Sequence, residues 1–298
     1  MKMNAQTKWG WEIAIYLFLA GLGAGAYVFG VVATFLGWSD IVARIGVMLG
    51  WPCVFIGCMF LILDLGTPSN FWRAAMRPNT SWIARGTIII SLFMIIDAIH
   101  IAFWIWPFGS VLQSADSTRE FISVLGVIFA FGTMVYTGIL LGAARPIAFW
   151  STQLLPLLFL VSALSTGCMG IALIATLAGA GYGEIEQIVK IDMLLIVLEL
   201  IVLGFYMQGS HRVEESRASA QMVMAGELAV MFWFGVVVIG LMVPLFLDLV
   251  VGEAAWTVAI GSGCGIIGGL LLRKVVLAGG IYAPLKAGRF EFALPRQS

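Results

Sequence analysis

Eight apolar segments, each long enough to cross a lipid bilayer, account for most of this sequence. A transmembrane helix needs about 20 mostly apolar residues, since each residue rises about 1.5 Å and the hydrocarbon layer is about 30 Å thick. The segments are residues 11–36, 41–63, 86–105, 121–143, 153–177, 188–206, 225–247 and 256–272. The sequence therefore predicts an all-α, polytopic membrane fold of eight transmembrane helices.

The composition agrees with lipid as the main solvent. Apolar residues make up 61% and charged residues 11% of the chain, against about 45–50% and about 25% in a soluble domain. Acids and bases number 16 each, so no nucleic acid partner is indicated. The connections are too short to form a domain. We predict two four-helix bundles, residues 1–145 and residues 146–298, the second with a C-terminal tail.

The cysteines do not indicate a metal site. All four lie in apolar runs, and no pair has the C-x-x-C spacing used by zinc and iron–sulfur sites. Burial as packing residues is predicted for Cys53, Cys58, Cys168 and Cys264.

The basic N-terminus resembles a signal peptide, with Lys2 and Lys8 before an apolar run. That run is longer than the roughly 7–15 residues of a signal peptide's hydrophobic region, and no clear small-residue cleavage site follows it. We expect a retained first helix.

The distribution of Lys and Arg predicts the orientation in the membrane. An even number of helices puts both termini on one side, and 13 of the 16 basic residues lie on that side. The other side has Arg44, Arg119 and Lys190. Because cytoplasmic loops carry an excess of basic residues, both termini are predicted to be cytoplasmic in the inner membrane. A basic face can also be a docking surface for an acidic partner.

Small residues crowd the first and last segments. Gly21 and Gly25 form a G-x-x-x-G motif, which usually allows close helix packing. Close approach to a flat ligand is the alternative.

Ionisable residues inside the apolar segments are few, and each is a functional candidate because a charge near the bilayer centre costs a few kcal/mol. They are Glu12, Asp64, Asp97, His100, Asp192, Glu199 and Glu227. Glu12 and Tyr16 are four residues apart and share a helix face near the N-terminal side. A ligand site, or a helix-end acid beside an interfacial tyrosine, would both explain them.

Asp97 and His100 are three residues apart and also share a helix face. They lie about 18 to 22 Å beyond Arg85, towards the side opposite the termini. The pair is either a structural contact that satisfies itself or a proton relay.

Tyr136 lies in the fourth segment, which returns to the N-terminal side. Its depth should therefore match that of Glu12. Two tyrosines and a carboxylate are predicted to converge, although tyrosine in a membrane helix is often a packing residue.

The number and positions of the histidines exclude an intramembrane bis-histidine haem. A b-type haem in a membrane usually takes two axial histidines from facing helices. This chain has only His100 and His211, and His211 lies in a connection. Redox electrons would have to arrive through another subunit.

Several motifs in the first half, taken together, resemble those of one family. They are Trp9-Gly10-Trp11-Glu12 before Gly21-Leu22-Gly23-Ala24-Gly25, Asp64-Leu65-Gly66-Thr67-Pro68, Phe71-Trp72, Pro78-Asn79-Thr80-Ser81-Trp82 and Tyr136-Thr137-Gly138. The chain is similar, over essentially its whole length, to NrfD/polysulfide reductase-type membrane subunits of respiratory molybdopterin oxidoreductase complexes.

The resemblance implies a haem-free subunit that exchanges electrons between membrane quinone, either menaquinone or ubiquinone, and an iron–sulfur partner. That ferredoxin-like partner would dock on the N-terminal side and connect to a molybdopterin or tungstopterin catalytic subunit. In the polysulfide reductase arrangement these partners face outward, whereas the charge distribution predicts cytoplasmic partners. Proton translocation could accompany turnover.

The resemblance also implies a quinone site in the first bundle. Tyr136 matches the family's site tyrosine, and Glu12 and Tyr16 occupy two positions that contact the quinone oxygens. A polysulfide reductase has amide and imidazole side chains there, so the quinone type and the direction of electron flow stay open. The further predicted lining residues are Gly21, Gly25, Asp64 and Arg85, and the predicted proton path is Asp97 and His100.

Two other classes remain. A secondary transporter would use glycine-rich helices and isolated acids along a translocation path, but no pair of broken helices is evident at matching positions. A passive membrane anchor without a quinone site would need only the apolar helices.

Overall fold

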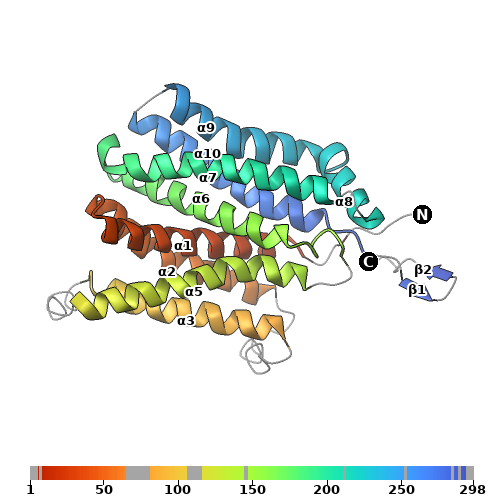
Figure 1. Cartoon of the computed structure of the whole chain (residues 1–298), viewed down its shortest axis with the longest axis horizontal. Coiled ribbons are helices and arrows are strands. Elements are labelled where there is room, and N and C mark those ends of the chain that lie inside the picture. Colours follow the sequence, from red (N-terminus) through yellow and green to blue (C-terminus); the bar gives the residue numbers. More distant parts are fainter. Residues whose placement is uncertain are drawn as a thin grey trace.

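A computed structural model describes residues 6, 9–64, 81–105, 116–143, 147–210, 213–251, 254–282, 285–287 and 290–292. Long helices lie side by side along one direction (Figure 1). The helices are α1 (Trp11–Leu36), α2 (Asp40–Leu63), α3 (Trp82–Ala102), α5 (Asp116–Gly142), α6 (Leu154–Leu177), α7 (Tyr182–Gly209), α8 (Glu214–Ala225), η3 (Met231–Met242), α9 (Val243–Phe246), η4 (Leu247–Val251) and α10 (Ala255–Ala278). A short antiparallel hairpin joins β1 (Leu285–Ala287) to β2 (Phe290–Phe292).

The all-α, polytopic prediction is confirmed. In the described part of the chain, seven helices are long and apolar enough to span a membrane: α1, α2, α3, α5, α6, the η3–α9–η4 helix and α10. The remaining predicted segment, residues 188–206, forms part of α7, which has 28 residues but contains Lys190, Asp192 and Glu199. Each of the eight predicted segments thus corresponds to a long helical stretch.

The helices form two neighbouring groups around a continuous core. Helices α1, α2, α3 and α5 lie together, and α6, α7, the η3–α9–η4 helix and α10 lie beside them (Figure 1). Helix α1 packs against α2 and also against α6 and α10 across the junction. The same hydrophobic cluster includes Tyr16, Phe93, Phe159 and Leu272, so apolar packing runs through both groups. The division into two bundles stays a prediction.

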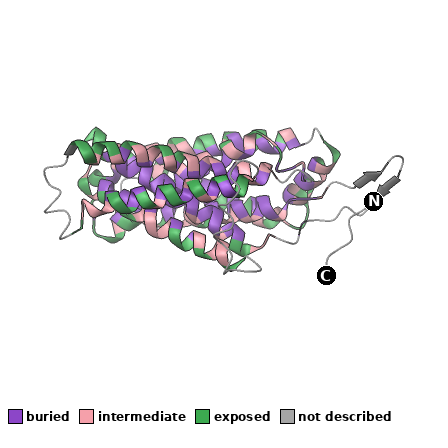
Figure 2. Ribbon diagram, turned by 90° about the horizontal axis from the view of Figure 1, so that it is seen from below, coloured by how far each residue is buried: buried purple, intermediate pink, exposed green. Residues whose placement is uncertain are grey.

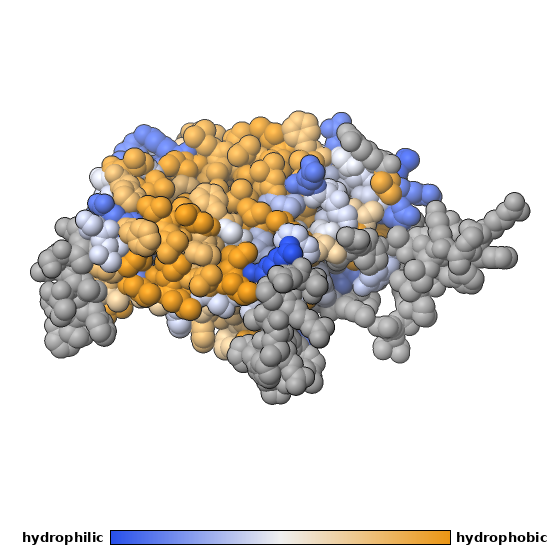
Figure 3. Space-filling model, turned by 60° about the horizontal axis from the view of Figure 1, so that its bottom comes forward, coloured by the Kyte–Doolittle hydropathy of each residue, from blue (hydrophilic) through white to orange (hydrophobic). Residues whose placement is uncertain are grey.

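The surface of the helices matches a lipid environment. Buried residues face the interior of the bundle, while exposed positions follow the outer sides of the helices (Figure 2). Many exposed positions carry large apolar side chains, including Phe35, Ile95, Leu194, Phe234 and Val250. Figure 3 shows a broad apolar belt with hydrophilic residues towards the two ends.

Two local features differ from the sequence expectation. The connection around Arg217 contains a helix, α8, that is too short and too polar to appear as a membrane span. The expected α-helix over residues 225–247 is instead mostly π-helical, because η3 and η4 flank a single turn, α9, with Pro244 near its start. π-Helical segments are rare and often occur at functional sites.

The beginning of α1 and the end of α10 meet at one end of the bundle, here called the N-terminal face. The Gln6 backbone N–H donates to the Gly280 carbonyl over 2.8 Å. Trp9 stacks on Trp150 with ring centroids 5.0 Å apart, and the Trp150 indole N–H donates to the Val276 carbonyl over 2.8 Å. These contacts tie the described start of the protein to the α5–α6 connection and to α10. The other end of the bundle is called the opposite face.

Candidate functional site

Glu12 and Tyr16 lie one helical turn apart at the start of α1, as predicted. Glu12 is exposed in the first turn, whereas Tyr16 is only 1% exposed. The Tyr16 hydroxyl is buried and has no hydrogen-bond partner among the described residues. An unpaired buried hydroxyl costs about 1–3 kcal/mol, so this orphaned donor is an unusual feature of the packed interior.

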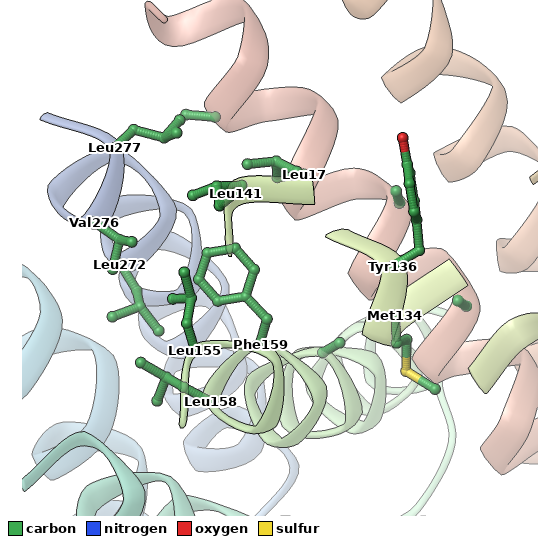
Figure 4. Packing of buried hydrophobic residues seen from close by; sticks show 14 of the residues in the cluster. Leu17, Met134, Tyr136, Leu141, Leu155, Leu158, Phe159, Leu272, Val276 and Leu277 are labelled. Carbon is green, nitrogen blue, oxygen red and sulfur yellow. The ribbon is translucent and has the colours of Figure 1, made fainter. Parts of the chain in front are cut away.

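Tyr136 reaches the same region from α5. Its ring lies against the backbone of α3, because a Cβ atom on Gly86 would be 1.7 Å from the Tyr136 Cζ atom. Tyr136 interacts electrostatically with Tyr16, and the Cys58 thiol of α2 interacts with both tyrosines. Figure 4 shows the Tyr136 side chain extending apart from the Leu155–Phe159 packing group. Side chains from α1, α2 and α5 therefore converge beside the first turns of α3.

Asp64 caps the C-terminal end of α2 and is exposed. Partial burial, and then the neighbouring Glu12 carboxylate, raise the pKa of Asp64 above its ordinary value. The two predicted acids are thus close enough to influence each other at the N-terminal face. A pair of neighbouring carboxyl groups at the rim can exchange protons with water.

Arg85 is exposed near the start of α3, and its guanidinium lies over the Trp82 ring, 4.7 Å from the centroid. It directly precedes Gly86, the residue that accommodates the Tyr136 ring. The Ser81 hydroxyl caps this helix by accepting from the Ala84 backbone N–H over 3.4 Å. Local capping therefore fixes the turn that brings Arg85 and Gly86 to the edge of the site.

Gly21 and Gly25 lie at the contact between α1 and α6. A Cβ atom on Gly25 would be 2.1 Å from the Ala163 carbonyl oxygen, and one on Gly21 would be 3.1 Å from the Ala163 Cβ atom. These positions show the close helix packing that small residues permit. Their predicted role as quinone contacts is not supported by a neighbouring site side chain and stays a prediction.

Asp97 and His100 are buried near the opposite face, but they do not form a self-satisfied pair. The Tyr27 hydroxyl and His100 Nδ1 are 2.9 Å apart, and the Ser123 hydroxyl is 3.3 Å from His100 Nε2. Both Asp97 carboxylate oxygens lack a hydrogen-bond partner in the described part of the chain. One of them lies against the backbone of Gly50, where a Cβ atom would be 2.3 Å away.

Sequence reasoning missed several polar contacts. Tyr27 and Ser123, the partners of His100, carry no distinctive sequence signal. Arg273 is one of the 13 basic residues that the sequence places on the side of the termini, but it is 1% exposed and lies inside the bundle. The available signal was that Arg273 directly follows the last predicted segment, which ends at Leu272, and that apolar residues resume at Val275.

Some predicted features fall outside the described residues. These are the motif residues 65–68, Phe71-Trp72 and residues 78–80, together with His211 and most of the basic residues at the two termini. All four cysteines are free, but the prediction of burial is confirmed only for Cys168, because Cys53, Cys58 and Cys264 are partly exposed on the sides of their helices. Within the described ranges, no group of three or more His, Cys, Asp or Glu side chains is placed to hold a metal ion.

The apolar belt, the long helices and the polar residues gathered at one end define a multi-pass integral membrane protein. The chain belongs to the family described as polysulphide reductase, NrfD, whose model matches residues 1–284.

Relatives support this membership along nearly the whole sequence. A polysulfide reductase chain of Wolinella succinogenes is 28% identical over 295 residues, covering 91% of each of the two proteins. Protein NrfD of Escherichia coli is 26% identical and covers 91% of this protein and 94% of its own length. A selenate reductase subunit of Mesobacillus selenatarsenatis is 22% identical, covering 89% of this protein and 74% of its own length. The protein is therefore similar to membrane subunits of multisubunit reductases.

Proposed function

We propose that this chain is the quinone-reactive membrane subunit of a respiratory oxidoreductase. The observation that carries the proposal is the orphaned Tyr16 hydroxyl, buried beside Tyr136 near the N-terminal face. A quinone oxygen is a suitable acceptor for such a hydroxyl, and a flat ring suits an aromatic, mostly apolar setting. The residues present therefore fit a quinone headgroup.

Each side chain has a defined task in this proposal. A quinone supplies two-electron, two-proton chemistry at its ring oxygens. The Tyr16 hydroxyl donates a hydrogen bond that orients the ring, and Tyr136 provides a second phenol held in place by Gly86. Glu12 holds a proton at its carboxylate and exchanges it with Asp64 and water at the rim.

Electrons reach this site through partners at the N-terminal face. We propose an iron–sulfur subunit docked there, connected to a molybdopterin or tungstopterin catalytic subunit. The relatives that are named as parts of a polysulfide reductase and a selenate reductase support a multisubunit assembly. Most basic residues lie in the termini and connections predicted for this side of the membrane, so we propose that the N-terminal face is cytoplasmic. The quinone is menaquinone or ubiquinone, and we expect no b-type haem in the purified protein.

The experiment compares the assembled complex with its Tyr136→Phe and Glu12→Gln variants. Both substitutions nearly conserve shape but remove a phenol donor or an ionisable acceptor. We expect slower quinone-linked turnover with unchanged assembly and unchanged activity with an artificial dye that bypasses this subunit. Glu186→Gln on α7 is the control, since Glu186 is partly exposed and pairs with Lys190 near the start of that helix, far along the chain from the site. Unchanged quinone kinetics in both variants would contradict the site and favour a passive anchor.

A further inference from the structure

The interior of α6, α7, η4 and α10 contains a contiguous set of polar side chains that the quinone site does not use. We call this set the polar file; it consists of Asp248, Asp192, Ser165, Glu199, Ser162 and Arg273. The Ser165 hydroxyl donates to the Asp192 carboxylate over 2.7 Å. Asp192 interacts electrostatically with both Asp248 and Glu199.

The file continues from Glu199 to Arg273. The Ser162 hydroxyl lies within hydrogen-bonding reach of the Glu199 carboxylate and accepts a hydrogen bond from Arg273. Arg273 also donates to the Phe159 carbonyl over 3.3 Å and interacts electrostatically with Glu199. Each ionisable residue in the file thus lies within electrostatic range of the next one, and hydrogen bonds of Ser165 and Ser162 link the file at Asp192 and at Arg273.

The file crosses most of the thickness of the bundle. Half-buried Asp248 lies three residues before the end of η4, within its last turn at the opposite face. Arg273 lies five residues before the end of α10, about 7.5 Å from the N-terminal face. Asp192 and Glu199, two turns apart on α7, occupy the middle and are 6% and 3% exposed.

A small cavity lies beside the centre of the file. Its volume is about 10 Å³, and its lining includes Ser165, Thr166 and Glu199 together with Gly240 of η3. A space of this size accepts about one water molecule, and the two hydroxyls and the carboxylate supply the two to four polar partners that a buried water needs. The π-helical wall is also a feature that recurs at functional sites.

The charges in the file do not balance if every acid is ionised. It contains three carboxyl groups and one guanidinium, and no ion pair joins Asp192 or Asp248 to a basic residue within the described ranges. Burying unpaired carboxylates in an apolar setting costs several kcal/mol each, so sharing protons among the three acids lowers the cost.

The end of the file at Arg273 approaches the quinone site. A Cβ atom on Gly21 would be 3.5 Å from an Arg273 guanidinium nitrogen. Gly21 is five residues from Tyr16 along α1, an axial distance of about 7.5 Å. Helix α1 thus joins the two polar regions.

We propose that the polar file is a hydrated proton path through the second half of the protein, running from Asp248 at the opposite face to Arg273 beside α1. A proton accepted by Asp248 passes to Asp192 and then, through the Ser165 hydroxyl and water in the cavity, to Glu199. Each carboxyl group passes the proton that it received to the next group, and Glu199 releases it to a water molecule on the Arg273 side of the file, so the transfer needs no redox partner. Arg273 keeps its charge and stabilises the deprotonated state of Glu199. Coupling of this path to turnover rests on the proposed quinone site, whereas the path itself does not.

The first test is independent of quinone. The infrared spectrum of the complex in water should contain a band from protonated carboxyl groups. Mixing with D₂O should shift the frequency of this band within the mixing time, because water reaches the carboxyl groups. Asp192→Asn and Glu199→Gln should each remove part of that band, and Glu186→Gln on the same helix should leave it unchanged. The absence of such a band would overturn the proposal. So would a carboxyl proton that exchanges with deuterium only after hours, as expected for a group that water does not reach.

The second test uses the complex in sealed vesicles. Asp192→Asn and Glu199→Gln should lower the number of protons moved per electron relative to Glu186→Gln. Unchanged stoichiometry in both variants would overturn the proposal. Absence of any quinone-linked turnover in the wild-type complex would instead contradict the proposed function, while the infrared result would still decide whether the path exists.

Discussion

The ring of Tyr136 occupies the space that any side chain on residue 86 would need. A Cβ atom at Gly86 would be 1.7 Å from Tyr136 Cζ and 2.1 Å from both Cε atoms. The contact joins α5 to the first turns of α3 and fixes the ring at a position that only glycine permits. The position of the Tyr136 ring therefore depends on the absence of a side chain at residue 86.

Gly86→Ala should displace Tyr136 and lower quinone-linked turnover by about 10- to 100-fold, because a misplacement of about 1 Å can cost this much. Overpacking should also destabilise the protein by about 1–3 kcal/mol. The measurements are steady-state kinetics with quinone and with an artificial dye. Gly204→Ala is the matched control, since a Cβ atom there has no neighbour within 4 Å. Equal kinetics for both variants would show that the Tyr136 position is unimportant.

Tyr16→Phe separates a structural role from a functional one. Removing an orphaned buried hydroxyl should leave the thermal stability of the complex unchanged or slightly higher. Quinone-linked turnover should fall about 2- to 13-fold, since a hydrogen bond contributes roughly 0.5–1.5 kcal/mol and each 1.36 kcal/mol is a factor of ten. A variant with lower stability and normal turnover would mean that the hydroxyl supports the fold instead.

Glu12→Gln should lower the pKa of Asp64. In the wild-type protein, burial and the Glu12 carboxylate both raise it, and the substitution removes the second cause. An infrared titration with isotope-labelled aspartate measures this shift. Because the folded-state pKa of Asp64 lies above that of the unfolded chain, ionisation of Asp64 opposes folding, and its stabilising contribution is lost as the pH rises through the folded pKa. The variant should lose less stability over that rise, and an unchanged Asp64 pKa would contradict their proximity.

The sequence predicted helix positions better than it predicted polar contacts. The apolar segments are long and nearly free of charge, so their helical form follows from the cost of unpaired backbone groups in lipid. The convergence of Tyr16 with Tyr136 followed from helix direction alone. By contrast, the partners of His100 depend on how α1 and α5 rotate about their axes, and Arg273 faces inward because of the packing between α10 and α6. Neither rotation is encoded in a short motif, and the π-helical turns have no simple sequence period.

Membrane orientation is testable with reporter fusions. Gln6 and Gly280 are hydrogen-bonded, so the described beginning and end of the protein lie on one side of the bundle. The excess of basic residues near that side predicts a cytoplasmic location. A C-terminal fusion should therefore be active as a cytoplasmic reporter and inactive as a periplasmic one. The reverse pattern would place the N-terminal face, and the iron–sulfur partner that we propose there, outside the cytoplasm.

The final prediction concerns Asp97, whose carboxylate is fully buried against α2 with no hydrogen-bond partner among the described residues. A backbone group of Trp51 approaches it, and Tyr27, the partner of His100, interacts with it electrostatically. Since His100 is held by Tyr27 and Ser123, Asp97 is not needed to satisfy the imidazole. Asp97 and His100 are therefore not a self-satisfied pair, and the proton relay stays a prediction.

Asp97→Asn removes the ionisable group while nearly conserving its shape. If Asp97 carries protons between the opposite face and the quinone site, turnover moves charge across the membrane, which is worth about 2.3 kcal/mol per charge at 100 mV. The variant should then move fewer protons per electron in sealed vesicles, even with the polar file intact. Asp40→Asn is the control, since Asp40 is an exposed acid paired with Arg44 near the same face. If Asp97→Asn keeps both its rate and its proton stoichiometry, the buried acid serves only to hold α3 against α2.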